Sequence, residues 1–285
     1  MKNSDRWKDV YAAWRYVFLT ALMYSFASPA LAAAGPALAG VSAHALIDVS
    51  CADDFKDYAL RTRAVMSEWY PKINEILYGP DHALPFETVA ILFEPGLKYP
   101  AFANGNIIQA DCNYIKVMPD DYRAMIIHEL VHVVQHYPAV PSNASWIVES
   151  MADYVRHKYF ERDIQETLHL RENGVLFDYT DKQPYFLGLQ SGGASLDDQG
   201  YLKSYTVGAT FLFWLETHKR AQIVRELNLA LSQGSYATNL FREWCGNSLD
   251  DLWAEFVTES KSNRNRGVAD VAHSSTHTPL SQHDR

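Results

Sequence analysis

Three histidines spaced four residues apart, with a glutamate directly after the first, stand in the segment HELVHVVQH at residues 128–136. On an α-helix, residues four apart share one face, so His128 and His132 can present two imidazole nitrogens to one metal ion. Glu129 would lie beside that ion, where a carboxylate can accept a proton from a zinc-bound water. The spacing predicts a Zn²⁺ site with a general base. The alternative is a buried helix whose histidines bind nothing, because so short a pattern also occurs by chance.

A zinc site that catalyses hydrolysis needs a third protein ligand. His136 lies eight residues after His128, about 12 Å along a helix axis, so one ion with bonds of about 2.1 Å cannot reach both. In the extended pattern HExxHxxGxxH a glycine turn brings in a third histidine, but Gln135 and Pro138 occupy these two positions here. His136 is therefore expected to line the cleft or to pack.

A pair of carboxylates follows in the segment WIVESMADYV, where Glu149 and Asp153 are again one helical turn apart. The other residues of this segment are almost all apolar, so the segment is expected to be buried, and buried carboxylates need partners. Glu149 is the predicted third metal ligand. Asp153 is predicted to accept the outer N–H of a ligand histidine and so to fix its tautomer.

The elements that must position these residues follow from hydrophobic periodicity and turn formers. Strands are predicted at 43–50 and 86–94, with two short strands or a hairpin at 105–117 around Asp111 and Cys112; helices are predicted at 53–77, from Asp120 or Asp121 to Tyr137, at 145–160, 205–218, 221–232, 237–245 and 248–260. Residues 161–200 are rich in turn formers and predict a long loop. Because the strands come first, the order predicts an α+β fold: an N-terminal mixed sheet with the active-site helix, then a helical half.

The N-terminal residues 1–32 have the pattern of a signal peptide: a basic start, an apolar stretch at 16–27, and an Ala-x-Ala site with cleavage after Ala32 or Ala34. The alternative is a membrane anchor, which needs about 20 apolar residues. Removing residues 1–32, with four basic and two acidic side chains, takes the net charge from −9 to −11. A secreted or periplasmic acidic protein is therefore predicted, without a stable membrane span after cleavage and without the basic surface of a nucleic-acid binder.

The predicted catalytic domain covers residues 33–261, and residues 262–285 are too poor in large apolar side chains to fold, which predicts a disordered polar tail. Export would place Cys51, Cys112 and Cys245 in an oxidising compartment. A disulfide between Cys51 and Cys112 is favoured because both flank predicted strands. The alternative is three buried thiols that form no disulfide.

Several segments together resemble the basic secretory protein-like peptidases of plants and bacteria. HELVHVVQ and WIVESMADYVR resemble the metal-binding segments of this family, and AFANGNIIQADCNYI, SYTVGATFLFWLE and LNLALSQGSYATNLFREWCGNSLDDLWAEF resemble three further blocks. The resemblance runs from about Leu46 to Ser260. It implies a zincin-like fold of the gluzincin type, with His128, His132 and Glu149 as metal ligands and Glu129 as the base.

The chain departs from the family pattern at two glycines and in its acidic charge. Ser150 replaces the glycine of Glu-Gly-x-Ala-Asp, and if that glycine allows two helices to approach, their packing must adjust. Ser204 replaces the glycine before the family's tyrosine. That tyrosine, Tyr205, is the first candidate for a hydrogen bond to the developing oxyanion. Tyr201 and His136 are alternatives, and Tyr205 can equally be a core residue with a satisfied hydroxyl.

These observations predict an exported zinc metallopeptidase that hydrolyses peptide or protein substrates. Glu129 would take a proton from the zinc-bound water and pass it to the leaving amine. The substrate is expected to add as a strand to an exposed sheet edge at NGNIIQAD, residues 104–111. One alternative is a secreted zinc-binding defence or binding protein of the same fold without turnover, and another is an extracellular scaffold without metal. The oligomeric state is not predicted.

Overall fold

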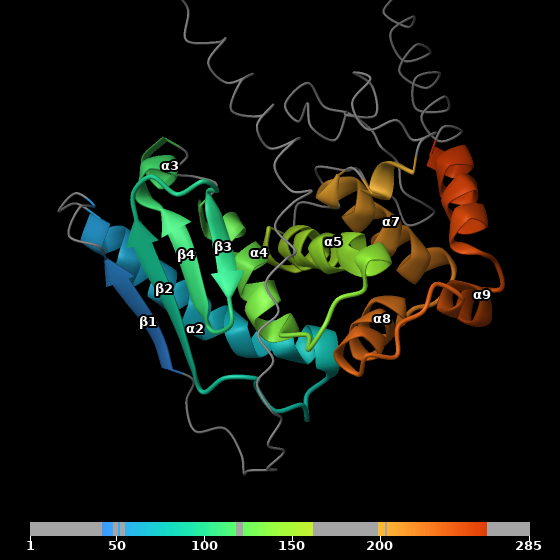
Figure 1. Ribbon diagram of the computed structural model, residues 1–285, viewed down its shortest axis with the longest axis horizontal. Helices are drawn as coiled ribbons and strands as arrows, with labels where there is room; N and C mark the ends of the chain where they lie inside the picture. Colours follow the sequence, from blue (N-terminus) through green and yellow to red (C-terminus); the bar gives the residue numbers. More distant parts are fainter. Residues whose placement is uncertain are drawn as a thin grey trace, which may run out of the picture.

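The computed structural model of the chain describes residues 42–47, 51, 55–117, 122–161, 199–202 and 204–260 (Figure 1). The predicted signal peptide, most of the turn-rich segment 161–200, the polar tail, and Asp120 and Asp121 lie outside these residues. Within them, none of the helices combines the length and the apolar character that a membrane span requires.

A four-stranded mixed sheet forms from the N-terminal half of the chain. Its spatial order is β1 (Ser42–Ile47), β2 (Thr88–Glu94), β4 (Ile107–Asp111) and β3 (Ala101–Asn104). Strands β1, β2 and β4 run parallel to one another, whereas β3 pairs antiparallel with β4. The sequence of β2 buries alternate side chains, because one face of the sheet is covered by α2 (Lys56–Tyr78) and α4 (Tyr122–Gln135).

The hairpin differs from the expectation in two ways. Its turn lies at Gly105 and Asn106, where Gly105 has a φ of 60°, and residues 112–117 form the short helix α3 (Cys112–Val117). In addition, β4 lies between β2 and β3, so the edge strands of the sheet among the described residues are β1 and β3. The expectation that residues 104–111 form the edge is therefore wrong. The apolar alternation of 107–111 marks a strand but does not indicate which neighbour pairs with it.

The second half of the chain is helical. It contains α5 (Ser145–Val155), which continues into the π-helical turn η3 (Arg156–Phe160), and then α7 (Tyr205–His218), α8 (Ile223–Ser232), α9 (Leu240–Cys245) and a final helix at 249–260. Single 3-10 turns, η2 (Ser142–Ala144) and η6 (Gly200–Leu202), precede α5 and α7. Strands first and helices later give the predicted α+β fold, which is confirmed.

Helix α4 is buried along nearly its whole length. It contacts the sheet and α2 on one side and α5 on the other, and α5 in turn packs against α7 (Figure 1). This explains why the sequence of α4 has no continuous polar face: apolar neighbours surround it. The few polar residues of α4 therefore lie inside the protein, where each needs a partner.

The predicted disulfide is not formed, because Cys51, Cys112 and Cys245 all remain thiols. The Cys51 thiol donates to the carbonyl oxygen of Phe93 in β2 at 3.4 Å, and Cys112 is fully buried. A position beside a strand does not determine in which direction a side chain points.

Candidate metal centre

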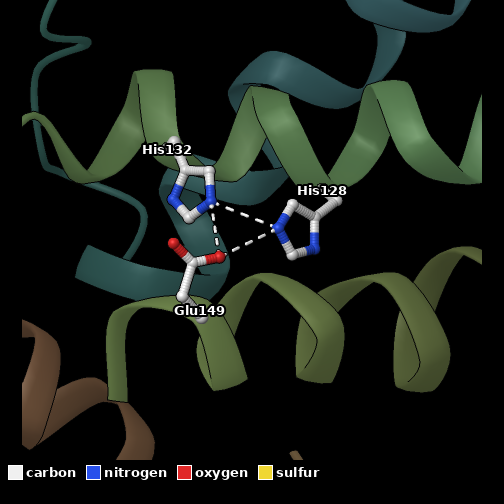
Figure 2. A group of neighbouring side chains, drawn as sticks. All are labelled: His128, His132 and Glu149. Atoms are coloured by element: carbon white, nitrogen blue, oxygen red, sulfur yellow. Dashed lines mark hydrogen bonds and ion pairs between the residues drawn. The ribbon is translucent and has the colours of Figure 1, made fainter. Parts of the chain in front are cut away.

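His128 and His132 project from α4 toward Glu149 of α5 (Figure 2). The two Nε2 atoms lie 3.2 Å apart, and Glu149 Oε2 lies 3.3 Å from His128 Nε2 and 3.4 Å from His132 Nε2. A tetrahedral ion with bonds of about 2.05 Å has ligand atoms about 3.3 Å apart. The three side chains therefore have the spacing of one face of a tetrahedral metal site, and two imidazoles with a carboxylate suit Zn²⁺ among the divalent ions.

The contact behind His128 determines which of its ring nitrogens faces Glu149. Asp153 Oδ1 lies 2.9 Å from His128 Nδ1. A carboxylate accepts a hydrogen bond, so Nδ1 carries a proton, and in the neutral ring the lone pair lies on Nε2, which faces the centre. The structure thus places Asp153 behind a candidate ligand, at the position where a second-layer partner fixes a tautomer.

Asp153 is itself held by two further contacts. Thr206, on α7, donates to Asp153 Oδ2 at 2.9 Å, and His157 Nε2 in the π-helical turn lies 3.8 Å from the same oxygen. Burial by itself raises the pKa of Asp153, but the hydrogen bonds and charges of His128 and His157 hold it well below its usual range. Sequence reasoning missed Thr206 and His157, because their contacts depend on how α7 and the π-helical turn pack against α5.

Glu129 lies beside the three candidate ligands. It is 8% exposed, and burial raises its pKa, although the histidine charges and a hydrogen bond from the backbone N–H of Ala103 act in the opposite direction. Ala103 belongs to the edge strand β3. A buried carboxylate with a raised pKa, next to a metal-type cluster, has the properties of a general base.

The two imidazoles and the carboxylates around them stabilise each other's charges. Burial lowers the pKa of His128, but Asp153, Glu149 and Glu129 more than reverse this and raise it to about 10. Burial raises the pKa of Glu149, but His132 and His128 bring it down to about 2. The cluster therefore favours positive charge at its centre, as a cation site requires.

The family model BSP, described as a peptidase of plants and bacteria, matches residues 101–256, more than half of the chain. The chain belongs to this peptidase family. The match begins at β3 and ends in the final helix, so it includes every residue of the candidate centre. No curated protein and no solved structure matches the chain.

Of the three oxyanion candidates in this BSP-family chain, the structure places only Tyr205 beside His128. The two rings are 5.9 Å apart and inclined by 22°. Burial and the carboxylates of Glu149, Asp153 and Glu129 raise the pKa of Tyr205, so its hydroxyl keeps its proton. Tyr201 is buried against Trp146 and Trp253, whereas His136 is exposed, has a φ of 30° and packs on Phe86.

The two serines at positions where the resemblance implies glycine are each accommodated locally. Ser204 is the N-cap of α7, and its hydroxyl accepts from Val207 N–H at 3.4 Å. Ser150 is fully buried and faces Gly208 of α7, where an added Cβ would lie 1.9 Å from Ser150 Oγ. The space that a serine needs on α5 is thus provided by a glycine on the facing helix.

Proposed function

We propose that this member of the peptidase family is an exported zinc metallopeptidase with Glu129 as its general base. The convergence of His128 Nε2, His132 Nε2 and Glu149 Oε2, at separations of 3.2 to 3.4 Å, carries the proposal. The N-terminal pattern of residues 1–32 supports export.

His128, His132 and Glu149 would hold the metal. When bound there, Zn²⁺ supplies a Lewis acid that polarises a carbonyl and makes a water molecule more acidic. Glu129 takes the proton of the attacking water and delivers it to the nitrogen of the leaving amine. Its raised pKa brings it closer to the working pH, where a base both accepts and returns a proton. The Tyr205 hydroxyl donates to the carbonyl oxygen as negative charge develops there.

The edge strand β3 is the proposed docking site for the backbone of the substrate. The two-residue turn makes Asn104 and Ile107 a hydrogen-bonded pair. Hydrogen-bonded pairs recur at every second residue along the two strands, and Pro100 with Asp111, whose N–H donates to Pro100 O at 2.8 Å, belongs to the same series. The intervening Ala103 N–H therefore points to the free edge, where it donates to Glu129. An extended peptide added to this edge would pass beside the base.

The decisive variant is Glu129→Gln, because glutamine keeps the shape of the side chain but cannot accept the proton. Peptide hydrolysis should fall about 10²- to 10⁴-fold, with zinc content by mass spectrometry and the circular dichroism spectrum unchanged. Glu87→Gln, the same change at an exposed glutamate, is the matched control.

Hydrolysis by Glu129→Gln at the parent rate would show that the mechanism is wrong. Zinc binding by the parent, without cleavage in a broad peptide-digestion profile, would instead favour a secreted zinc-binding protein without turnover.

A further inference from the structure

Gln135, the last residue of α4, connects one candidate ligand to the backbone beside another. Its side chain is almost completely buried, with Oε1 2.8 Å from His132 Nδ1, and its Nε2 donates to the carbonyl oxygen of Val148 at 3.1 Å. Val148 directly precedes Glu149. The backbone of Gln135 is held as well, because the Tyr78 hydroxyl donates to its carbonyl oxygen at 3.2 Å.

The Val148 carbonyl determines the orientation of the amide. A carbonyl oxygen only accepts hydrogen bonds, so the NH₂ end of Gln135 must face Val148, and Oε1 must face His132. The amide oxygen also only accepts, so His132 Nδ1 must carry a proton. In the neutral ring the lone pair then lies on Nε2, the atom 3.4 Å from Glu149 Oε2.

We propose that Gln135 is a positioning residue that fixes the tautomer and ring orientation of His132 and thereby prepares the metal centre. The inference rests on the proposed zinc site and extends it. Gln135 acts behind His132 as Asp153 acts behind His128, but without a charge. Glu129, Glu149 and Asp153 already supply three carboxylates, so an amide holds the Nδ1 proton without adding a fourth.

The test compares two substitutions at this position. Gln135→Met has a similar length but makes neither hydrogen bond, and it should weaken zinc binding about 10- to 100-fold in a competition titration with a chromophoric chelator. The slowly exchanging Nδ1–H signal of His132 in the NMR spectrum of the zinc-loaded protein should also disappear. Gln135→Glu keeps an acceptor for His132 but loses the donor to Val148, so it should weaken zinc binding less than Gln135→Met and should retain the signal.

The control is Gln233→Met, the same chemical change at an exposed glutamine after α8, which should alter neither measurement. Parent-like zinc affinity of Gln135→Met would overturn the inference and leave the zinc site standing. Equal weakening by both substitutions at 135 would also overturn it, because the contact with Val148 would then be the one that matters. A parent protein that binds no zinc would overturn the proposed function and the inference together.

Discussion

Replacing Gly208 by alanine should destabilise the protein, because Gly208 of α7 packs directly on Ser150 of α5. A Cβ at position 208 would lie 1.9 Å from Ser150 Oγ and 2.9 Å from Ser150 Cβ. Ser150 is completely buried, so its side chain has little room to turn away. The substitution must therefore push α5 and α7 apart. Glu149 lies on the first of these helices and Tyr205 on the second.

The magnitude follows from two opposing effects. Overpacking a core costs about 1–3 kcal/mol, and the overlap at Gly208 is severe enough for the upper end. Alanine is favoured over glycine inside a helix by about 1 kcal/mol, which leaves a net loss of about 2 kcal/mol. In a Ser150→Gly background the two nearest atoms are gone and the Tyr201 carbonyl oxygen, at 3.4 Å, is the next contact. There Gly208→Ala should stabilise the protein by about 1 kcal/mol.

The coupling between the two substitutions is therefore about 3 kcal/mol, near the upper end for residues in contact. Ser150→Gly alone should have a small effect, because it also removes a buried hydroxyl that has no hydrogen-bond partner among the described residues. Urea unfolding of the parent, both single variants and the double variant would measure the coupling, with a chelator present so that metal binding does not contribute. If the two effects simply add, the contact between Ser150 and Gly208 is not the cause.

Four further predictions concern the candidate centre. Glu149→Ala should lower zinc affinity by more than the approximately 10- to 100-fold of an outer partner, and unchanged affinity in a competition titration would remove Glu149 from the ligands. Asp153→Ala should lower it about 10- to 100-fold without unfolding the domain; parent-like binding would leave Asp153 a purely structural role. Tyr205→Phe should reduce kcat about 10²- to 10³-fold at unchanged zinc content, and a parent-like kcat would exclude the proposed hydrogen bond. Removing zinc held at 100 times its Kd should cost about 2.7 kcal/mol, lowering the thermal midpoint by about 5–10 °C; a midpoint insensitive to chelator and zinc would argue against a metal site.

Local patterns were sufficient to predict the elements that have clear boundaries in the sequence. The predicted helix at 205–218 coincides with α7, because an N-capping serine precedes an uninterrupted apolar stretch. The helix predicted at 145–160 exists, but its last turn is π-helical, and no residue of RHKYF signals that change. The predicted hairpin around Asp111 and Cys112 lies too late in the chain, because Gly105 and Asn106 have the stronger turn chemistry and form the turn.

Within the candidate centre, the sequence predicts only the contacts between residues that are one helical turn apart. The spacing within α4 and within α5 brings His128 near His132 and Glu149 near Asp153, without knowledge of the fold. Gln135, three residues after His132, is within the same reach and was overlooked. The orientation of the Gln135 amide, with its oxygen toward His132, depends on the contact with Val148 and therefore on how α4 and α5 pack together.

The different partners of the two histidines follow from the charges that surround each one. Asp153, behind His128, stays ionised because the hydrogen bonds and charges of His128 and His157 hold its pKa well below the usual range. Thr206 of α7 donates to it as well. The acceptor behind His132 lies instead at the end of α4, where its other neighbour is the Val148 carbonyl. A carboxylate there would face that oxygen without a donor, close to Glu149, which already raises the pKa of Glu129. An amide satisfies both neighbours, donating to the carbonyl and accepting from the imidazole, so the neutral residue is the one that fits this position.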